Sequence, residues 1–191
     1  MKELDFLNSY WHKCNNHQGI AANKHFLVLD KTLMDAIKSP GIREDVIQTK
    51  YKGTKKWDMH FPEKKIAIEY KTVSDVGGSN HYMGSCINHR IEEAIGAAID
   101  LKYKHTDYKL GYIWIFVFRN RDAIVVNQVN KAIRSFEKML EDNLYDFFFP
   151  AITFGPDDHQ ELSGVHTFSK FVSDIKNQPI IQTTPLTEAM L

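Results

Sequence analysis

Two acidic residues and a lysine lie at a spacing that could support hydrolysis. Asp58 is followed, after ten intervening residues, by Glu69-Tyr70-Lys71. Two carboxylates that converge in a polar pocket repel each other, so such a pair is normally stabilised by a divalent cation or a shared proton. Mg²⁺ takes oxygen ligands and keeps several waters, and the backbone carbonyl of Tyr70 could add a third protein oxygen. Beside that ion, Lys71 could position or deprotonate a water that attacks a phosphodiester.

A hairpin over residues 54–71 would bring these groups together. Apolar and polar residues alternate on both sides of Pro62-Glu63-Lys64, which predicts two strands with one apolar and one polar face. Matching the apolar faces sets the register, because a slip of one residue would oppose apolar and polar rows. That register pairs Trp57 with Tyr70, Met59 with Ile68 and Phe61 with Ile66. It also sets Asp58 opposite Glu69, with β-carbons about 4.5–5.5 Å apart, and projects Lys71 from the same face as Glu69.

The remaining sequence predicts a mixed α/β fold, in which a mixed central sheet is flanked by helices. Apolar spacing and breakers predict helices over residues 20–38, 87–104, 127–142 and 166–176, strands over 111–118 and 147–154, and a polar loop over 72–86. Residues 111–118 are apolar throughout, as in a strand covered on both faces. The run Phe147-Phe148-Phe149 is assigned to the core or to a dimer interface.

No repeat or linker divides the chain. We therefore expect a single domain over residues 1–191, with N-terminal helices over about 1–40, a catalytic core over about 50–155 and a C-terminal helical tail over about 160–191. Two cysteines exclude a disulfide scaffold and a zinc site of paired Cys-x-x-Cys units. The chain has no long apolar run and no signal-peptide pattern, so we expect a soluble, cytoplasmic protein without membrane contact.

Charge is unevenly distributed along the chain. The totals of 24 basic and 24 acidic residues cancel, but residues 1–136 hold 21 and 15 of them and residues 137–191 hold 3 and 9. A basic body with an acidic tail allows a polyanion site on the body. Lys50, Lys52, Lys55 and Lys56 form a run without an acid, which would suit phosphate contacts next to Asp58 or form a solvated surface.

Other candidate residues are weaker. A further carboxylate could come from Asp30 or Asp35 on the preceding helix, where both lie outside the apolar stripe. His60 could touch a phosphate or, as we favour, have a structural role. Structural or exposed roles are also favoured for His12, Cys14 and His17, which lack a fourth ligand at zinc-finger spacing. The pairs Asn80-His81 and Asn88-His89 lack the spacing of a histidine-metal nuclease.

Several of these motifs together resemble a known family. Thr54-Lys55-Lys56-Trp57-Asp58 followed by Ile68-Glu69-Tyr70-Lys71 resembles the PD-(D/E)xK nuclease core. Gly78-Ser79, then Asn88-His89-Arg90-Ile91-Glu92-Glu93-Ala94-Ile95-Gly96 and Asp100-Leu101, are similar to the XhoI-type restriction endonucleases. Those enzymes carry a Lys-Trp-Asp strand, a Glu-aromatic-Lys strand, a Gly/Ser/Asn loop and an Asn-x-Arg-x-Glu-Glu-Ala-x-Gly helix in this order. The resemblance covers residues 50–118, with weaker matches at Tyr10-Trp11 and Leu144-Tyr145-Asp146.

The resemblance implies a type II restriction endonuclease that cuts both strands of DNA at a short palindrome, CTCGAG or a related sequence. It implies Mg²⁺, with Mn²⁺ as a substitute, a homodimer, and a cognate DNA methyltransferase in the same system. Asp58, Glu69 and the Tyr70 carbonyl would hold the metal, and Lys71 would act at the attacking water. DNA contacts are expected from Lys52, Lys55, Lys56, Ser79, Asn80, His81, Asn88 and Arg90, and supporting roles from Glu93 and Asp35. Residues 80–86 depart from an Asn-rich family stretch, so the recognised sequence could differ.

Two other functions remain open from the sequence. A structure-specific or repair nuclease could use the same three groups on junctions, ends or single strands, because base readout depends on loop side chains that the motifs do not determine. A catalytically inert DNA-binding relative is disfavoured because Asp58, Glu69 and Lys71 are all present.

Overall fold

A mixed five-stranded sheet forms the centre of the protein. The computed structural model describes residues 11–12, 22–38, 46–49, 53–74, 80–155, 158–160 and 167–181. Its main sheet has the order β3-β4-β5-β6-β7, formed by β3 (Met59–Phe61), β4 (Ile66–Ser74), β5 (Lys109–Val117), β6 (Phe147–Thr153) and β7 (His159–Gln160). β4, β5 and β6 are parallel, whereas β3 and β7 pair antiparallel at the two ends.

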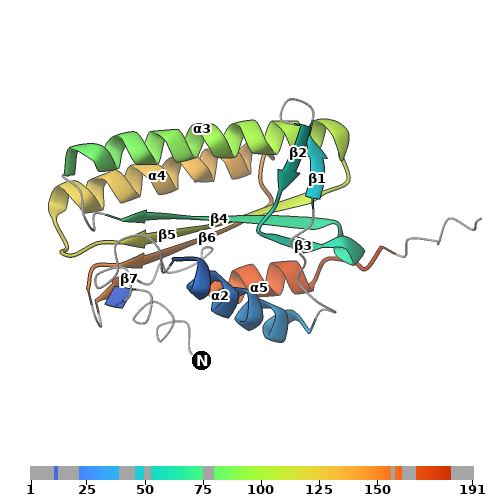
Figure 1. Ribbon diagram of the computed structural model, residues 1–191, viewed down its shortest axis with the longest axis horizontal. Coiled ribbons are helices and arrows are strands. Elements are labelled where there is room, and N and C mark those ends of the chain that lie inside the picture. Colours follow the sequence, from blue (N-terminus) through green and yellow to red (C-terminus); the bar gives the residue numbers. More distant parts are fainter. Residues whose placement is uncertain are drawn as a thin grey trace, which may run out of the picture.

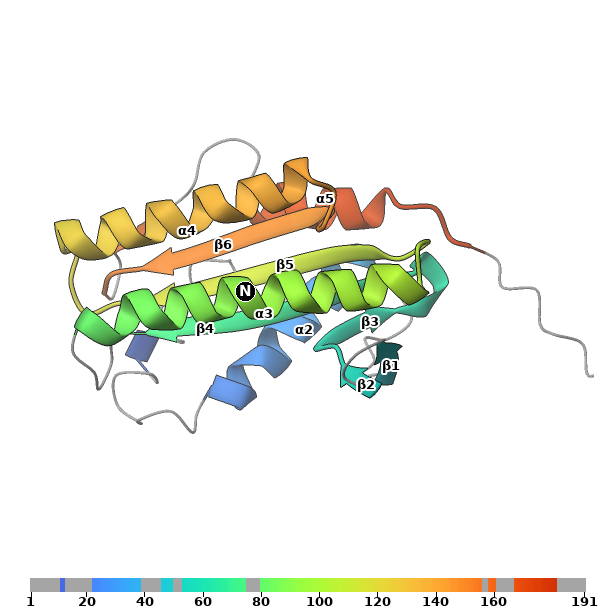
Figure 2. The same cartoon turned by 90° about the horizontal axis from the view of Figure 1, so that it is seen from above.

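Helices cover both faces of this sheet. The described helices are α2 (Ala22–Ile37), α3 (Asn80–Lys104), α4 (Ala123–Glu141) and α5 (Phe168–Lys176). α3 and α4 lie on one face, and α2 and α5 lie on the other (Figure 1). α3 connects β4 to β5 and α4 connects β5 to β6, as parallel neighbours require long crossovers. Seen from above, the two crossover helices run along the strands that they connect (Figure 2). The expected mixed α/β architecture is therefore present.

Strand β5 lies between two apolar layers. Tyr112, Trp114 and Phe116 pack in the layer under α3 and α4, whereas the residues between them pack in the layer over α2 and α5. All are buried, which confirms the prediction that residues 111–118 are covered on both faces. Phe147, Phe148 and Phe149 are likewise divided between the two layers, so this run is core.

The β3–β4 hairpin has the predicted register but two buried faces. Met59 pairs with Ile68 and Phe61 with Ile66. The connection is a 3-10 turn, η1 (Pro62–Lys64), that closes at a left-handed Lys65 (φ 50°). The second face carries the predicted polar residues but is largely closed to solvent, since His60 and Glu69 are each only 5% exposed on the side that α3 and α4 cover.

The first predicted strand of the hairpin is divided at Trp57 and Asp58. Upstream of this break, β2 (Gly53–Lys56) pairs with β1 (Val46–Thr49) in a separate two-stranded sheet. Trp57 is fully buried in the layer under α3 and α4, whereas Tyr70 packs in the opposite layer. The prediction that Trp57 and Tyr70 pair on one face of the hairpin is therefore wrong. The chain turns between the two sheets at this point, and the alternation of side chains does not continue through the bend.

Helix boundaries differ from the predictions mainly in α3. This helix begins at Asn80, and β4 extends to Ser74, so residues 72–74 and 80–86 do not belong to the predicted loop. Residues 75–79 lie outside the described part of the chain. Gly84 and Ser85 have weak helix propensity, but a helix that is anchored in the core over residues 87–101 extends by further turns at little cost. The other three helices and β6 lie within a few residues of their predicted positions.

Candidate active site

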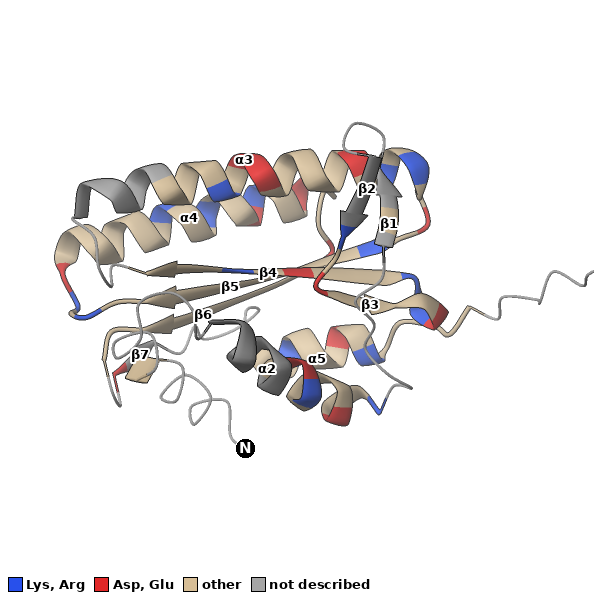
Figure 3. Cartoon of the chain, in the orientation of Figure 1, with Lys and Arg blue, Asp and Glu red and all other residues tan. Residues whose placement is uncertain are grey.

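The Asp-Glu-Lys group lies where β3 separates from β4. Glu69 and Lys71 share the strand alternation of Ala67 and Val73, which pack in the layer under α3 and α4. Asp58 immediately precedes β3, and its Oδ2 accepts a hydrogen bond from the Tyr70 N–H at 3.0 Å. The Asp58 carboxylate therefore contacts the Tyr70 peptide, between Glu69 and Lys71, whereas the β3–β4 ladder begins at the Met59–Ile68 pair and does not include the expected Asp58–Glu69 pair. Figure 3 shows acidic and basic positions beside each other at this end of the β3–β4 ladder.

Glu69 and Lys71 form a close ion pair. Lys71 Nζ lies 2.7 Å from Glu69 Oε1. The Glu69 side chain is 6% exposed and that of Lys71 is 26% exposed, so the pair has a buried carboxylate and a partly accessible ammonium group. The lysine thus compensates the buried negative charge while its nitrogen stays within reach of solvent.

The backbone of Tyr70 also faces this group. In a strand, the N–H and C=O of one residue point to the same side. Because the Tyr70 N–H is directed to Asp58, its carbonyl is directed to the same edge of β4 and away from β5. The Tyr70 side chain packs in the opposite apolar layer. The Tyr70 carbonyl oxygen therefore lies on the same edge as the Asp58 carboxylate.

Helix α3 adds a second ion pair next to the first. Arg90 Nη1 donates to Glu93 Oε2 at 2.6 Å, and His89 Nδ1 lies 3.9 Å from Glu93 Oε1. Partial burial raises the pKa of Glu93, but the hydrogen bond and charge of Arg90, with the charges of His89 and Lys71, outweigh burial and leave this pKa below its ordinary value. Glu93 is therefore a carboxylate at neutral pH, and Lys71 is close enough to influence it.

A buried tyrosine lies beneath the charged residues. Tyr112 is the β5 partner of Glu69 in the parallel register and is 1% exposed. Burial raises the pKa of its phenol well above the ordinary range, and the charges of Glu69, Glu93 and Asp58 raise it further against the opposing effect of Arg90. The sequence gives no signal for this placement, because an aromatic position in an all-apolar strand does not indicate that its hydroxyl lies near a charged group.

The expected DNA contacts are only partly described. Lys52 and Ser79 lie outside the described residues. The backbones of Lys55, Asn80 and His81 belong to β2 and α3, and their side chains lie outside the described part. Lys56 and Asn88 are exposed, whereas Arg90 is half-buried and bound to Glu93. Arg90 therefore holds a carboxylate, a contact that the sequence does not indicate.

Asp35 is not brought to the site. It is exposed on α2, and α2 covers the face of the sheet opposite to the one with Glu69 and Lys71. Asp30, half-buried on the same helix, is separated from them by the same sheet. Of the two residues expected to support the site, only Glu93 lies on the charged side of β4, because the crossover helix α3, and not α2, packs over the strand there.

His60 and His12 are the weaker histidine candidates that the structure describes in full. His60 is buried, and its Nε2 lies 2.9 Å from Tyr108 Oη, in agreement with the structural role that we favoured. His12 is exposed, and Cys14 and His17 lie outside the described residues.

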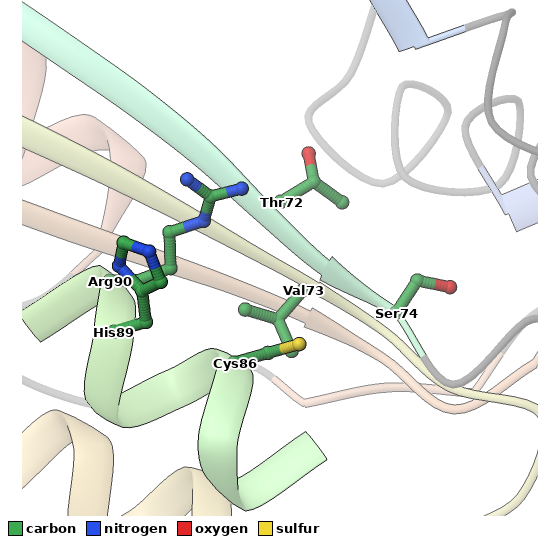
Figure 4. A pocket seen from close by; sticks show the side chains of 6 residues that line it. All are labelled: Thr72, Val73, Ser74, Cys86, His89 and Arg90. Atoms are coloured by element: carbon green, nitrogen blue, oxygen red, sulfur yellow. The ribbon is translucent and has the colours of Figure 1, made fainter. Parts of the chain in front are cut away.

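A pocket of about 260 Å³ opens beside the two ion pairs. It is lined by Thr72, Val73 and Ser74 of β4 and by Cys86, His89 and Arg90 of α3. The Arg90 guanidinium group extends across the gap from α3 to β4, and the His89 ring lies beside it (Figure 4). The pocket therefore lies next to the charged residues, between β4 and α3.

The donor set at this point consists of hard oxygen atoms. Within the described ranges, no three His, Cys, Asp or Glu side chains come together closely enough to hold a metal ion. Asp58 and Glu69 supply two carboxylates, and the Tyr70 carbonyl faces the same edge. Such a set suits a Mg²⁺ ion that keeps most of its waters. With Glu93, Lys71 and Arg90 included, the formal charge is −1, and a divalent cation would change it to +1.

Comparison with known proteins gives no relative: no family model, curated protein or solved structure matches this chain. In the part of the chain that is described, no helix is long and apolar enough to cross a membrane.

Proposed function

We propose that this protein is a Mg²⁺-dependent DNA endonuclease with a PD-(D/E)xK core, of the XhoI restriction type. The observation that carries the proposal is the meeting of Asp58, Glu69 and Lys71 around the Tyr70 peptide. The sheet and crossover helix support it as well, since the Glu-Tyr-Lys segment lies on β4 and the following Asn-x-Arg-x-Glu-Glu segment lies on α3, in the order that the resemblance implies.

Each residue of the group has a role that its position explains. Asp58 and Glu69 would hold the cation, and the Tyr70 N–H fixes the orientation of the Asp58 carboxylate. When bound, Mg²⁺ would activate a water and neutralise charge that develops on the phosphate. Lys71 is partly exposed, so its ammonium group can orient the attacking water and stabilise the negative charge that forms beside it. Arg90 holds Glu93 ionised at the edge of the site.

The substrate follows from the reaction class and the resemblance. We propose double-stranded DNA as the substrate and a homodimer as the active form, because a twofold protein reads a palindrome with one surface patch on each half-site. CTCGAG or a related sequence is the proposed target, and a cognate methyltransferase is the proposed partner in the same system. Lys56 and Asn88 are exposed on elements next to the site, and we propose that they make backbone or base contacts.

The direct test is incubation of the purified protein with a long DNA of known sequence, with Mg²⁺, with Mn²⁺ and with a chelator. We expect discrete fragments with a shared end sequence in the presence of either metal and intact DNA in the chelator. Products that depend on junctions or free ends would instead support a structure-specific nuclease. DNA binding without cleavage in either metal would support an inert relative and would contradict the proposal.

A further inference from the structure

The pocket formed by residues 72–74 of β4 and residues 86–90 of α3 suits an anion. None of its six lining residues is acidic, and five of the six carry a polar or ionisable side chain. Arg90 offers a guanidinium group, which has five N–H donors in a planar fork. Only Nη1 is used in the bond to Glu93, which also fixes the orientation of the group. Figure 4 shows the Arg90 guanidinium group directed to β4, across the pocket.

The position of the pocket relative to Lys71 indicates which anion it would accept. Val73 lies two residues beyond Lys71 on β4, which is about 7 Å at the rise of a strand. DNA has one phosphate per about 3.4 Å of helix axis in each strand, so this distance corresponds to one or two nucleotides. A DNA strand whose scissile phosphate lies at Lys71 would therefore bring a neighbouring phosphate to the pocket.

We infer that this pocket is a subsite for a backbone phosphate one or two nucleotides from the cleaved bond, with Arg90 as its main contact. The inference rests on the proposed nuclease function and extends it to a defined part of the substrate. A phosphate in this pocket would set the register of the strand over Asp58, Glu69 and Lys71 and would carry no sequence information. His89, whose side chain is 71% exposed at the pocket, is placed to add a second donor.

Cys86 provides a direct measure of occupancy. It is a free, exposed cysteine that lines the pocket. The sequence has two cysteines, so Cys14→Ser leaves Cys86 as the single thiol. The experiment measures the rate of alkylation of Cys86 by iodoacetamide, with and without saturating duplex DNA, in Ca²⁺, and records cleavage in parallel samples that contain Mg²⁺. We expect saturating DNA to slow alkylation roughly tenfold or more, since less than about a tenth of the sites then stay open.

Arginine variants identify the contact. The logarithm of the DNA-binding constant falls as the logarithm of the salt concentration rises, and Arg90→Gln should make this negative slope shallower by about 0.9, the value for one lost phosphate contact. The double variant Arg90→Gln with Glu93→Gln has the same net charge as the wild-type protein. Its salt slope should therefore stay shallower than the wild-type slope only if Arg90 itself contacts a phosphate. Arg134→Gln, at an exposed position on α4, is the matched control and should leave the slope unchanged.

Three results would overturn the inference. The first is alkylation of Cys86 at an unchanged rate while DNA is fully bound, and the second is a normal salt slope in the double variant. The third is protection of Cys86 by millimolar inorganic phosphate but not by DNA, which would indicate a small phosphorylated ligand. Metal-dependent cleavage with Cys86 unprotected would support the nuclease function and refute the phosphate subsite. Protection of Cys86 by DNA without cleavage under Mg²⁺ would refute the nuclease function and support the phosphate subsite.

Discussion

Replacing Glu69 by glutamine removes one negative charge from the site and changes little of its shape. The Glu69 carboxylate is 6% exposed and lies 2.7 Å from Lys71 Nζ. Glutamine keeps an oxygen that can accept from the lysine, but it is a poor ligand for a hard divalent cation. Glu69→Gln therefore separates the role of the charge in hydrolysis from the role of the side chain in packing.

The expected effects on activity and stability differ in size. Loss of transition-state charge stabilisation of about 4 kcal/mol corresponds to roughly a thousandfold slower cleavage. Breaking a fully buried ion pair costs about 3–5 kcal/mol of folding free energy. The Lys71 side chain is 26% exposed and can be hydrated when its partner is neutral, so we expect the free energy of unfolding to fall by only about 1–2 kcal/mol.

Two measurements on the same preparation test this reasoning. Single-turnover cleavage of supercoiled plasmid in Mg²⁺ gives the rate of hydrolysis, and urea unfolding gives the stability. Glu141→Gln, at an exposed position at the end of α4, makes the same chemical change away from the site and should affect neither. A folded Glu69→Gln protein that cleaves DNA within tenfold of the wild-type rate would refute the assignment of Glu69 as a metal ligand.

Three further predictions concern the surroundings of the site. Arg90→Met should lower the free energy of unfolding above pH 4.5, the ordinary pKa of Glu93. Because Arg90 lowers the pKa of Glu93 in the folded protein, the difference from wild type should disappear as the pH falls through that lower folded pKa. A difference in urea unfolding that does not depend on pH would contradict the Arg90–Glu93 pairing. Gly111→Ala should destabilise the protein by about 1–3 kcal/mol through overpacking, because a Cβ there would lie 2.9 Å from Ile68 Cγ1, and unchanged thermal stability would refute this close approach. Lys56→Ala should weaken binding to all DNA sequences and make the negative slope of log binding constant against log salt shallower by about 0.9. An unchanged slope would show that the DNA does not contact Lys56.

The hairpin and the central strand could be predicted because their signals are local. Alternating residues on both sides of a Pro-containing turn restrict the register, so Met59 was correctly paired with Ile68. The unbroken apolar run around Trp114 likewise indicated burial on both faces. Asp58, Glu69 and Lys71 could be brought together by the same argument, since their proximity depends on one short turn.

Other features depended on contacts between distant segments. The break at Trp57 follows from the change of partner between β2 and β3, which alternation within a single segment does not reveal. The early start of α3 is consistent with helix cooperativity, since residues 87–101 anchor the helix in the core and its extension into a Gly- and Ser-containing segment then costs little.

The sequence by itself therefore determined the chemical groups and the pairing of the strand that carries Glu69 and Lys71. Only the tertiary structure decided which helix covers them. α3 brings Arg90 and Glu93 to the charged face of β4, and α2 places Asp35 on the other face. The physical reason is that apolar periodicity shows which side of a helix is buried, whereas the face of the sheet that receives it depends on the path of the whole chain.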